Sequence, residues 1–111
     1  MQTFAFALDL VDEPGAVERY EALHRAVWRE VEAALKAVGV EDLPIFRIGL
    51  RLVMVVRAGD EFDPARDFAR YLEHNDRIPQ WEALMQTVQK RVPEARPGEQ
   101  WARMKEIYRL D

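Results

Sequence analysis

The apolar residues of this chain recur every second residue in some segments and every three to four residues in others, and the order of these segments restricts the fold. Residues 3–10, TFAFALDL, alternate strictly, with two phenylalanines and two leucines on one face, which is typical of a strand. Residues 14–38 have helical spacing and end before Gly39, a residue suited to the position after a helix. The chain is therefore expected to begin with a strand followed by one long helix.

Two strands are expected next. The segments LPIFRIG (43–49) and LRLVMVVRA (50–58) predict a hairpin that turns near Gly49. The second of these segments is rich in Val, Leu and Met, which indicates a strand buried on both faces in its middle.

The remaining elements are a second helical region and a last strand. Asp63 and Pro64 have the residue types of a helix cap and a first helical residue. The helical pattern pauses over residues 74–79 and restarts at Pro79. Residues 101–110, WARMKEIYRL, alternate again and predict the final strand.

The expected order is β-α-β-β-α-β, in which two helices cover one face of a four-stranded antiparallel sheet, the ferredoxin-like plan of α+β proteins. The other face also carries apolar positions and needs a cover. A second copy of the chain, related by a two-fold axis, is the simplest cover, so we expect a homodimer. Residues 1–111 show no linker and no repeat and are expected to form a single domain.

Composition excludes several classes of function. Twenty acidic residues against sixteen basic residues give a net charge of −4, opposite in sign to the charge that drives nucleic-acid binding. No segment approaches the roughly 20 apolar residues of a membrane span, and no signal peptide is recognised. The chain has no cysteine, which excludes disulfides and thiolate chemistry. We expect a cytoplasmic protein with neither a nucleic-acid nor a membrane partner.

The stretch RYEALHRAVWRE (19–30) places Tyr20, His24 and Trp28 four residues apart. On one continuous helix these side chains lie along one flank of the buried stripe, where they would give a pocket an aromatic wall and an imidazole. A histidine packed in the core is the competing interpretation, and Tyr and Trp at this spacing are also common in cores. The spacing leaves both interpretations open.

Other chemical signals are weaker. His24 and His74 lie far apart in the sequence without a cysteine, which argues against a transition-metal site, although Glu21 or Glu30 could join His24. No glycine-rich phosphate loop and no nucleophile elbow occurs. We expect no metal and no cofactor. His74 is expected at a surface or cap position. The stretch PGEQW (97–101) places Glu99 and Trp101 beside a tight turn; a loop that closes onto the last strand is the favoured interpretation for Gly98, and the role of Glu99 stays open.

Several motifs together resemble one family. YEALHRAVWREVEAALKAVGV resembles the signature of the L-rhamnose mutarotase family, with Tyr, His, Trp and Glu at the spacing of Tyr20, His24, Trp28 and Glu30. IFRIGLRLVMVV, QWEALM and YRL resemble the central hairpin, the tryptophan motif and the terminal strand of the family, in the same order. The resemblance covers nearly the whole chain. It implies a dimeric ferredoxin-like α/β barrel, the plan that the element order predicts independently.

The resemblance also implies roles for individual residues. The residue that matches His24 is the proton donor of the family, and those that match Tyr20 and Trp81 contact the sugar. Leu43 and Glu82 depart from the rhamnose enzymes, which have a tyrosine and a second tryptophan at these positions. Both positions belong to the sugar pocket of the family, so Leu43 and Glu82 are expected to border the substrate with a changed specificity.

The combination of QWEALM and PGEQW is more similar to the branch of the family associated with L-fucose. We therefore expect an aldose mutarotase that interconverts the anomers of a 6-deoxy-L-hexose, with L-fucose as the main substrate and L-rhamnose as the alternative. His24 would transfer the protons of ring opening, with Tyr20 as its partner or as a ligand of a sugar hydroxyl. Trp28 and Trp81 would lie against the apolar face of the monosaccharide.

Two interpretations from other classes stay open. Dimeric barrels of this kind also include cofactor-free and haem-binding oxygenases, which is an analogy at the level of the fold. A sugar-binding protein without catalytic activity would use the same aromatic residues.

Overall fold

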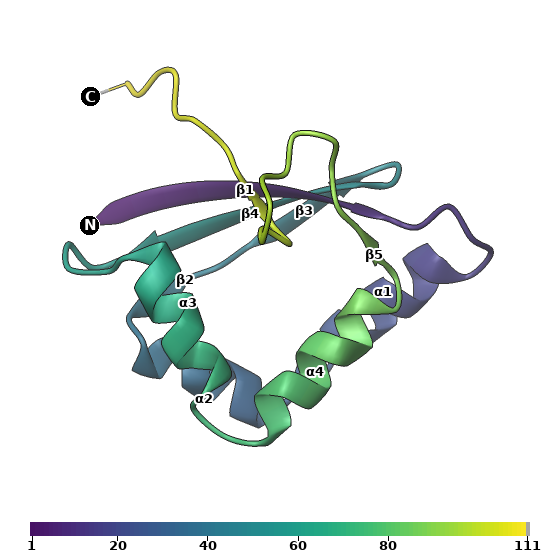
Figure 1. The fold of residues 1–111 in the computed structure, drawn as a ribbon, viewed down its shortest axis with the longest axis horizontal. Helices are drawn as coiled ribbons and strands as arrows, with labels where there is room; N and C mark the ends of the chain where they lie inside the picture. The colour runs from purple at the N-terminus through teal and green to yellow at the C-terminus, as the bar shows by residue number, and fades with distance from the viewer. Residues whose placement is uncertain (111) are drawn as a thin grey trace.

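The computed structural model describes residues 1–110 as an antiparallel sheet with its helices on one face (Figure 1). The single domain expected over residues 1–111 stays a prediction, and Asp111 lies outside the described residues. The elements in chain order are β1 (Gln2–Leu10), α1 (Ala16–His24), α2 (Arg29–Ala37), β2 (Val40–Asp42), β3 (Ile45–Ile48), β4 (Arg51–Ala58), α3 (Pro64–Leu72), α4 (Arg77–Gln86), β5 (Gln89–Lys90) and β6 (Ala102–Arg103).

The sheet is built around the antiparallel pair β1 and β4, whose register runs from Gln2 opposite Ala58 to Asp9 opposite Arg51. Both β2 and β3 pair with the other edge of β4. Both β5 and β6 pair with the other edge of β1. Each outer position of the sheet is thus filled by two short strands. The overall order is β2-β4-β1-β5, in which β3 lies beside β4 like β2, and β6 lies beside β1 like β5. This topology confirms the expected α+β, ferredoxin-like fold.

The core lies between the sheet and the helices. The alternation expected for the first strand is confirmed, because the side chains of β1 buried on the helical side are Phe4, Phe6, Leu8 and Leu10. The burial of β4 on both faces is wrong. Leu52, Met54 and Val56 are buried, whereas Val53 and Val55 are only half-buried. The reason is that the helices cover one face of the sheet and leave the other face of this chain partly exposed.

The single helix expected over residues 14–38 is also wrong, because the chain forms α1 and α2 with a break over residues 25–28. The Arg25 N–H is shared between two preceding carbonyls as α1 ends. Trp28 is extended, with φ −59° and ψ 136°, and precedes α2. Its indole packs against the Trp81 ring of α4, with 5.2 Å between ring centroids. Burying this aromatic pair offsets the helical hydrogen bonds lost at the break.

The hairpin and the second helical region follow the expected local signals. Gly49 has φ +58° in the turn between β3 and β4, a conformation that glycine adopts without strain. The Asp63 side chain accepts a hydrogen bond from the Arg66 N–H at 3.1 Å, and Pro64 is the first residue of α3. The restart of the helical pattern is confirmed, although α4 begins at Arg77, before the expected Pro79. No helix in the described part of the chain is long and apolar enough to cross a membrane.

The last strand expected over residues 101–110 is wrong for most of its length. Of residues 101–110 only Ala102 and Arg103, which form β6, pair with β1, and residues 104–110 have no regular structure. The Ile107 and Leu110 side chains are 89% and 82% exposed. In Figure 1 this segment leads away from the helices, past the other side of the sheet. An alternating pattern forms a strand only where one of its faces can pack, and this single chain offers the segment no such surface within residues 1–110.

Candidate active site

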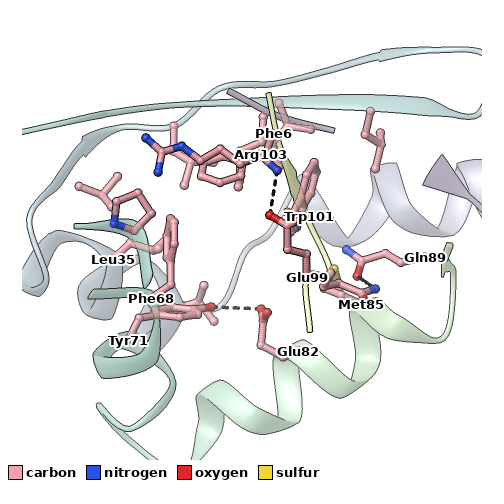
Figure 2. A pocket seen from close by; sticks show the side chains of 18 of the residues that line it. Phe6, Leu35, Phe68, Tyr71, Glu82, Met85, Gln89, Glu99, Trp101 and Arg103 are labelled. Atoms are coloured by element: carbon pink, nitrogen blue, oxygen red, sulfur yellow. Dashed lines mark hydrogen bonds between the residues drawn. The ribbon is translucent and has the colours of Figure 1, made fainter. Parts of the chain in front are cut away.

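A cavity of about 1770 Å³ lies between the inner face of the sheet, the helices and the segment that leads to β6 (Figure 2). This volume exceeds the range of about 300–1,000 Å³ that is common for small-molecule sites. Five residues expected at the site line the cavity: Tyr20, His24, Leu43, Trp81 and Glu82. Segments far apart in the sequence therefore supply one candidate site.

The His24 ring is half-buried and held by a hydrogen bond from Nδ1 to the main-chain carbonyl of Tyr20, at 2.8 Å. A carbonyl oxygen can only accept, so Nδ1 carries a hydrogen in every protonation state that keeps this bond. The other nitrogen, Nε2, is therefore the one that can gain and lose a proton. This geometry makes His24 a residue that can act as a general acid or a general base toward a ligand in the cavity.

Two aromatic rings contact the His24 imidazole. The Tyr20 ring lies 4.3 Å from it between centroids, at an interplanar angle of 31°. The Trp81 ring lies 5.6 Å away in an edge-to-face arrangement, at 67°. These contacts and the hydrogen bond to the Tyr20 carbonyl limit the rotation of the imidazole.

The Tyr20 side chain, in the middle of α1, is buried, and burial raises the pKa of its phenol to about 12. A hydrogen bond with the Gln89 side chain opposes the shift, and the nearby charge of Glu82 adds to it. The Gln89 oxygen in turn accepts a hydrogen bond from the Gln100 amide at 3.1 Å, which turns the Gln89 amide nitrogen toward Tyr20. The phenol thus accepts from Gln89 and keeps its own hydrogen for another acceptor.

A carboxyl group enters the cavity from α4. Figure 2 shows Glu82 facing Tyr71 of α3, and the Tyr71 hydroxyl donates a hydrogen bond to Oε2 of Glu82 at 3.3 Å. Burial raises the pKa of the Glu82 carboxyl, while the hydrogen bond from Tyr71 partly lowers it. The Tyr71 hydroxyl is buried beside this negative charge, and the pKa of Tyr71 is raised far above its usual value. Tyr71 is therefore a fixed hydrogen-bond donor to Glu82.

The structure does not place every expected residue at the cavity. Among the described residues that line it, Trp28 is not included. The Trp28 ring instead lies between Trp81, at 5.2 Å, and the Arg77 guanidinium, at 4.0 Å from the ring centroid. His74 is exposed at the end of α3, outside the cavity lining. Trp28 thus lies behind Trp81, in a second layer.

Glu99 lines the cavity from the segment before β6, but its carboxylate is engaged by the main chain. It accepts hydrogen bonds from the N–H groups of Arg96, at 2.8 Å, and Arg103, at 3.4 Å. These bonds, that of Arg96 first, lower the pKa of the Glu99 carboxyl. Glu99 therefore closes the loop before β6, a role that the sequence left open.

Several residues that line the cavity could not be predicted as site residues from sequence patterns. Figure 2 places Tyr71, Gln89 and Trp101 around the same cavity as Glu82. Tyr71 and Gln89 occur in ordinary polar surroundings in the sequence, and their roles come from neighbours on other elements. Trp101 is an aromatic residue beside the turn at PGEQW, and the sequence pattern predicts no role for it in the site.

The described residues contain no cluster of three or more His, Asp or Glu side chains arranged to hold a metal ion. The polar groups of the cavity include an imidazole, phenols, amides and carboxyls, which can donate or accept hydrogen bonds, together with Arg and Lys side chains.

Comparisons with known proteins identify the relatives of this chain. The family model for L-rhamnose mutarotase matches residues 3–110. An L-fucose mutarotase of Xanthomonas campestris pv. campestris is 43% identical over 112 residues, which cover 99% of this chain and 89% of the relative. An L-rhamnose mutarotase of Burkholderia orbicola is 33% identical over 101 residues, covering 89% of this chain and 90% of the relative.

A solved structure supports the fold. The L-rhamnose mutarotase of Formosa agariphila superposes with a TM-score of 0.72 over the whole of both chains, at 18% identity. At this identity the likeness establishes the fold alone, whereas the family model and the relatives establish descent. The chain belongs to the L-rhamnose mutarotase family.

Proposed function

We propose that this protein is an aldose mutarotase that interconverts the α and β anomers of a 6-deoxy-L-hexose, with L-fucose as its main substrate. The 43% identity with an L-fucose mutarotase supports this substrate. The observation that carries the proposal is the His24 ring, which lines the cavity. Its Nδ1 is bound to the Tyr20 carbonyl, and its Nε2 has no hydrogen-bond partner among the described residues. Such a ring is suited to a reaction that consists only of proton transfer and ring opening.

Mutarotation opens the sugar ring and closes it again. A proton leaves the anomeric hydroxyl O1, the bond between C1 and the ring oxygen O5 breaks, and O5 takes up a proton. The open-chain aldehyde then closes on either face of C1. His24 supplies one of the two proton transfers through Nε2, and the expected gain from such general acid–base catalysis is about 10²–10⁴-fold.

Tyr20 serves as a hydrogen-bond donor to a sugar hydroxyl in this proposal. Its pKa of about 12 keeps the phenol protonated near neutral pH, so it cannot readily remove a proton. Because Gln89 already donates to the phenol oxygen, the Tyr20 hydrogen is directed to the ligand.

The apolar side of the deoxy sugar packs against Trp81, which lines the cavity next to His24. Trp28 contributes to substrate binding through Trp81, because its ring supports that indole from the second layer. Leu43 provides an apolar patch in the same cavity, in keeping with a specificity different from that of the rhamnose enzymes.

L-rhamnose is the second candidate substrate, favoured by the match of the L-rhamnose mutarotase model to residues 3–110. The two sugars differ in hydroxyl configuration, so the rate ratio depends on the polar groups of the cavity.

Saturation-transfer NMR of the anomeric protons tests the function directly. Added protein should accelerate anomer exchange of L-fucose more than that of L-rhamnose. Spontaneous exchange rates for both sugars, with folded protein present, would contradict the proposal. Binding of sugar without acceleration would indicate a non-catalytic sugar-binding protein, and a change in the absorption spectrum of added haem would favour the oxygenase class.

The proposal extends to a homodimer in the cytoplasm. The half-buried outer face of β4 and the exposed apolar residues of the C-terminal segment 104–110 support a second copy as the cover. The cytoplasmic location expected from the sequence stays a prediction, which cell fractionation would test.

A further inference from the structure

Ring opening needs two proton-transfer groups, and His24 supplies one of them. Tyr20, the other group considered for this role, is held as a neutral phenol by a pKa of about 12. The second group must therefore be another titratable side chain at the cavity, able to lose a proton near neutral pH.

The other carboxyl groups of the cavity are poorly suited to this task. Glu21 forms an exposed ion pair with Arg47 at 2.6 Å. The Glu99 carboxylate is bound by two main-chain N–H groups, which keep it ionised and occupied. The remaining acidic side chains of the lining are exposed to solvent, namely Glu32, Glu41, Asp42 and Glu106.

Glu82 differs from these carboxyls in burial and in its contacts. Its Oε2 accepts a hydrogen bond from the Tyr71 hydroxyl at 3.3 Å, while Oε1 has no hydrogen-bond partner within the described residues. Glu82 lines the same cavity as Tyr20 and His24, and its charge raises the pKa of Tyr20, whose ring packs against His24. Glu82 also directly follows Trp81 in α4, and the Trp81 ring is in edge contact with the His24 imidazole.

We propose that Glu82 is the second catalytic residue of the mutarotase, that its free oxygen Oε1 exchanges a proton with the sugar, and that Tyr71 is its positioning residue. This inference rests on the proposed function. It assigns a proton-transfer role to a position expected from the sequence only to border the substrate.

The step balances with these two groups. The Glu82 carboxylate takes the proton of O1–H as C1=O1 forms and the C1–O5 bond breaks. The electron pair of that bond goes to O5, which takes the proton from Nε2–H of the His24 imidazolium. After rotation about C1–C2, neutral His24 removes the O5 proton, O5 attacks the other face of C1, and the Glu82 carboxylic acid returns its proton to O1.

The environment of Glu82 fits this exchange. Burial raises the pKa of the carboxyl toward the range in which imidazoles titrate, which eases proton transfer in both directions. The titratable and charged side chains that line the cavity together with Glu82 are Tyr20, Glu21, His24, Glu32, Lys36, Glu41, Asp42, Arg47, Tyr71, Arg96, Glu99, Arg103, Lys105 and Glu106. The hydrogen bond from Tyr71 acts in the opposite direction, because it stabilises the ionised carboxylate and so lowers the pKa of Glu82.

The test compares the full-length wild type with Glu82→Gln, using anomer exchange of L-fucose and L-rhamnose measured by NMR over a range of sugar concentrations. Glutamine keeps the size and hydrogen-bonding capacity of the side chain but cannot take up a proton. We expect kcat to fall by about 10²-fold or more while KM changes little. Glu73→Gln, at an exposed residue outside the cavity lining, is the matched control and should keep the wild-type rate.

The outcomes separate this inference from the proposed function. A kcat within tenfold of the wild type for Glu82→Gln, or a change confined to KM, overturns the catalytic role of Glu82 and leaves the mutarotase proposal intact. A wild type that accelerates neither sugar overturns the proposed function itself. Glu82→Asp keeps the carboxyl and should recover part of the lost kcat, and if Glu82→Gln does not fold, a wild-type kcat in Glu82→Asp overturns the inference.

Tyr71→Phe tests the positioning role by a readout that packing alone would not change. Loss of the donor raises the pKa of the Glu82 carboxyl further, so the acidic limb of the pH profile of kcat/KM should move to higher pH. A lower rate with an unmoved acidic limb would overturn the role assigned to Tyr71.

Discussion

The hydrogen bond between the His24 ring and the Tyr20 carbonyl selects the nitrogen that can do chemistry. Because Tyr20 and His24 are four residues apart on α1, the ring reaches back to a carbonyl of its own helix. The same helical spacing stacks the phenol on the imidazole. Two neighbouring turns of one helix thus provide the proton-transfer group and its orientation.

Replacing His24 by Ala should lower kcat/KM for anomer exchange by about 3–5 kcal/mol of transition-state stabilisation, because the main acid is lost. NMR exchange measurements give the rates, and circular dichroism checks the fold. His74→Ala is the matched control, since this histidine is exposed and lies outside the cavity lining. An unchanged rate in folded His24→Ala would refute the assignment.

Replacing Tyr20 by Phe should weaken sugar binding by about 1 kcal/mol, because one hydrogen bond to a hydroxyl is lost. The expected result is a higher KM with a kcat close to that of the wild type, measured by exchange rates over a range of sugar concentrations. A fall in kcat of about 10²-fold at constant KM would instead assign proton transfer to Tyr20.

At the scale of elements, α3 is held by a charged cluster at its first turn. The buried Asp67 carboxylate accepts hydrogen bonds from the Arg66 guanidinium, the Asp63 N–H and the Arg70 guanidinium. These bonds, that of Arg66 first, lower the pKa of Asp67 well below its usual range. Asp67 thus joins the start of α3 to the preceding loop.

The lowered pKa of Asp67 makes the stability of the fold depend on acid. The ionised carboxyl stabilises the folded state above its unfolded pKa, near 3.8, and this contribution is lost as the pH falls toward the lower folded value. Asp67→Asn should therefore unfold at lower urea concentration than the wild type at pH 7, with a smaller difference at pH 2.5. Asp76→Asn, at an exposed cap without a side-chain hydrogen bond, is the control. An equal deficit at both pH values would contradict the role of the charge.

The elements differ in how far the sequence predicts them. The β1 strand, the hairpin at Gly49 and the start of α3 at Asp63 follow from local residue patterns, and the structure contains all three. The break before α2 depends on contact between Trp28 and Trp81, which lie far apart in the chain, so helical spacing alone could not reveal it. Tertiary packing overrides local periodicity in such cases.

The same reasoning applies to the candidate site. Tyr20 and His24 could be paired from the sequence because they share one helix at a spacing of four residues. The contact between Tyr71 and Glu82 joins α3 to α4, and the sequence around either residue does not predict this contact. Glu82 was found only because its position departs from a family pattern, and its role in chemistry needs the cavity geometry.

At the scale of the molecule, the C-terminal segment 104–110 presents exposed Ile107 and Leu110 on the side of the sheet away from the helices. Exposed apolar side chains in such a segment are stabilised when another protein surface covers them and removes them from water. The proposed dimer provides that surface.

Sedimentation equilibrium should therefore show a dimer for the full chain, and Ile107→Asp together with Leu110→Asp should weaken the dimer by at least about tenfold, because charges replace buried apolar groups at the interface. Leu72→Asp, at an exposed apolar residue of α3 on the helical side, should leave the dimer unchanged. A monomeric wild type, or a dimer insensitive to the two substitutions in the segment, would contradict this arrangement.

The volume of the cavity has a consequence for turnover. At about 1770 Å³ the space is several times larger than a monosaccharide needs. A site that fits tightly around one anomer would bind that anomer preferentially. In this larger cavity the open-chain aldehyde can rotate about its C1–C2 bond before it dissociates. Ring closure on either face of C1 can then follow a single binding event, so each bound sugar can be released as either anomer.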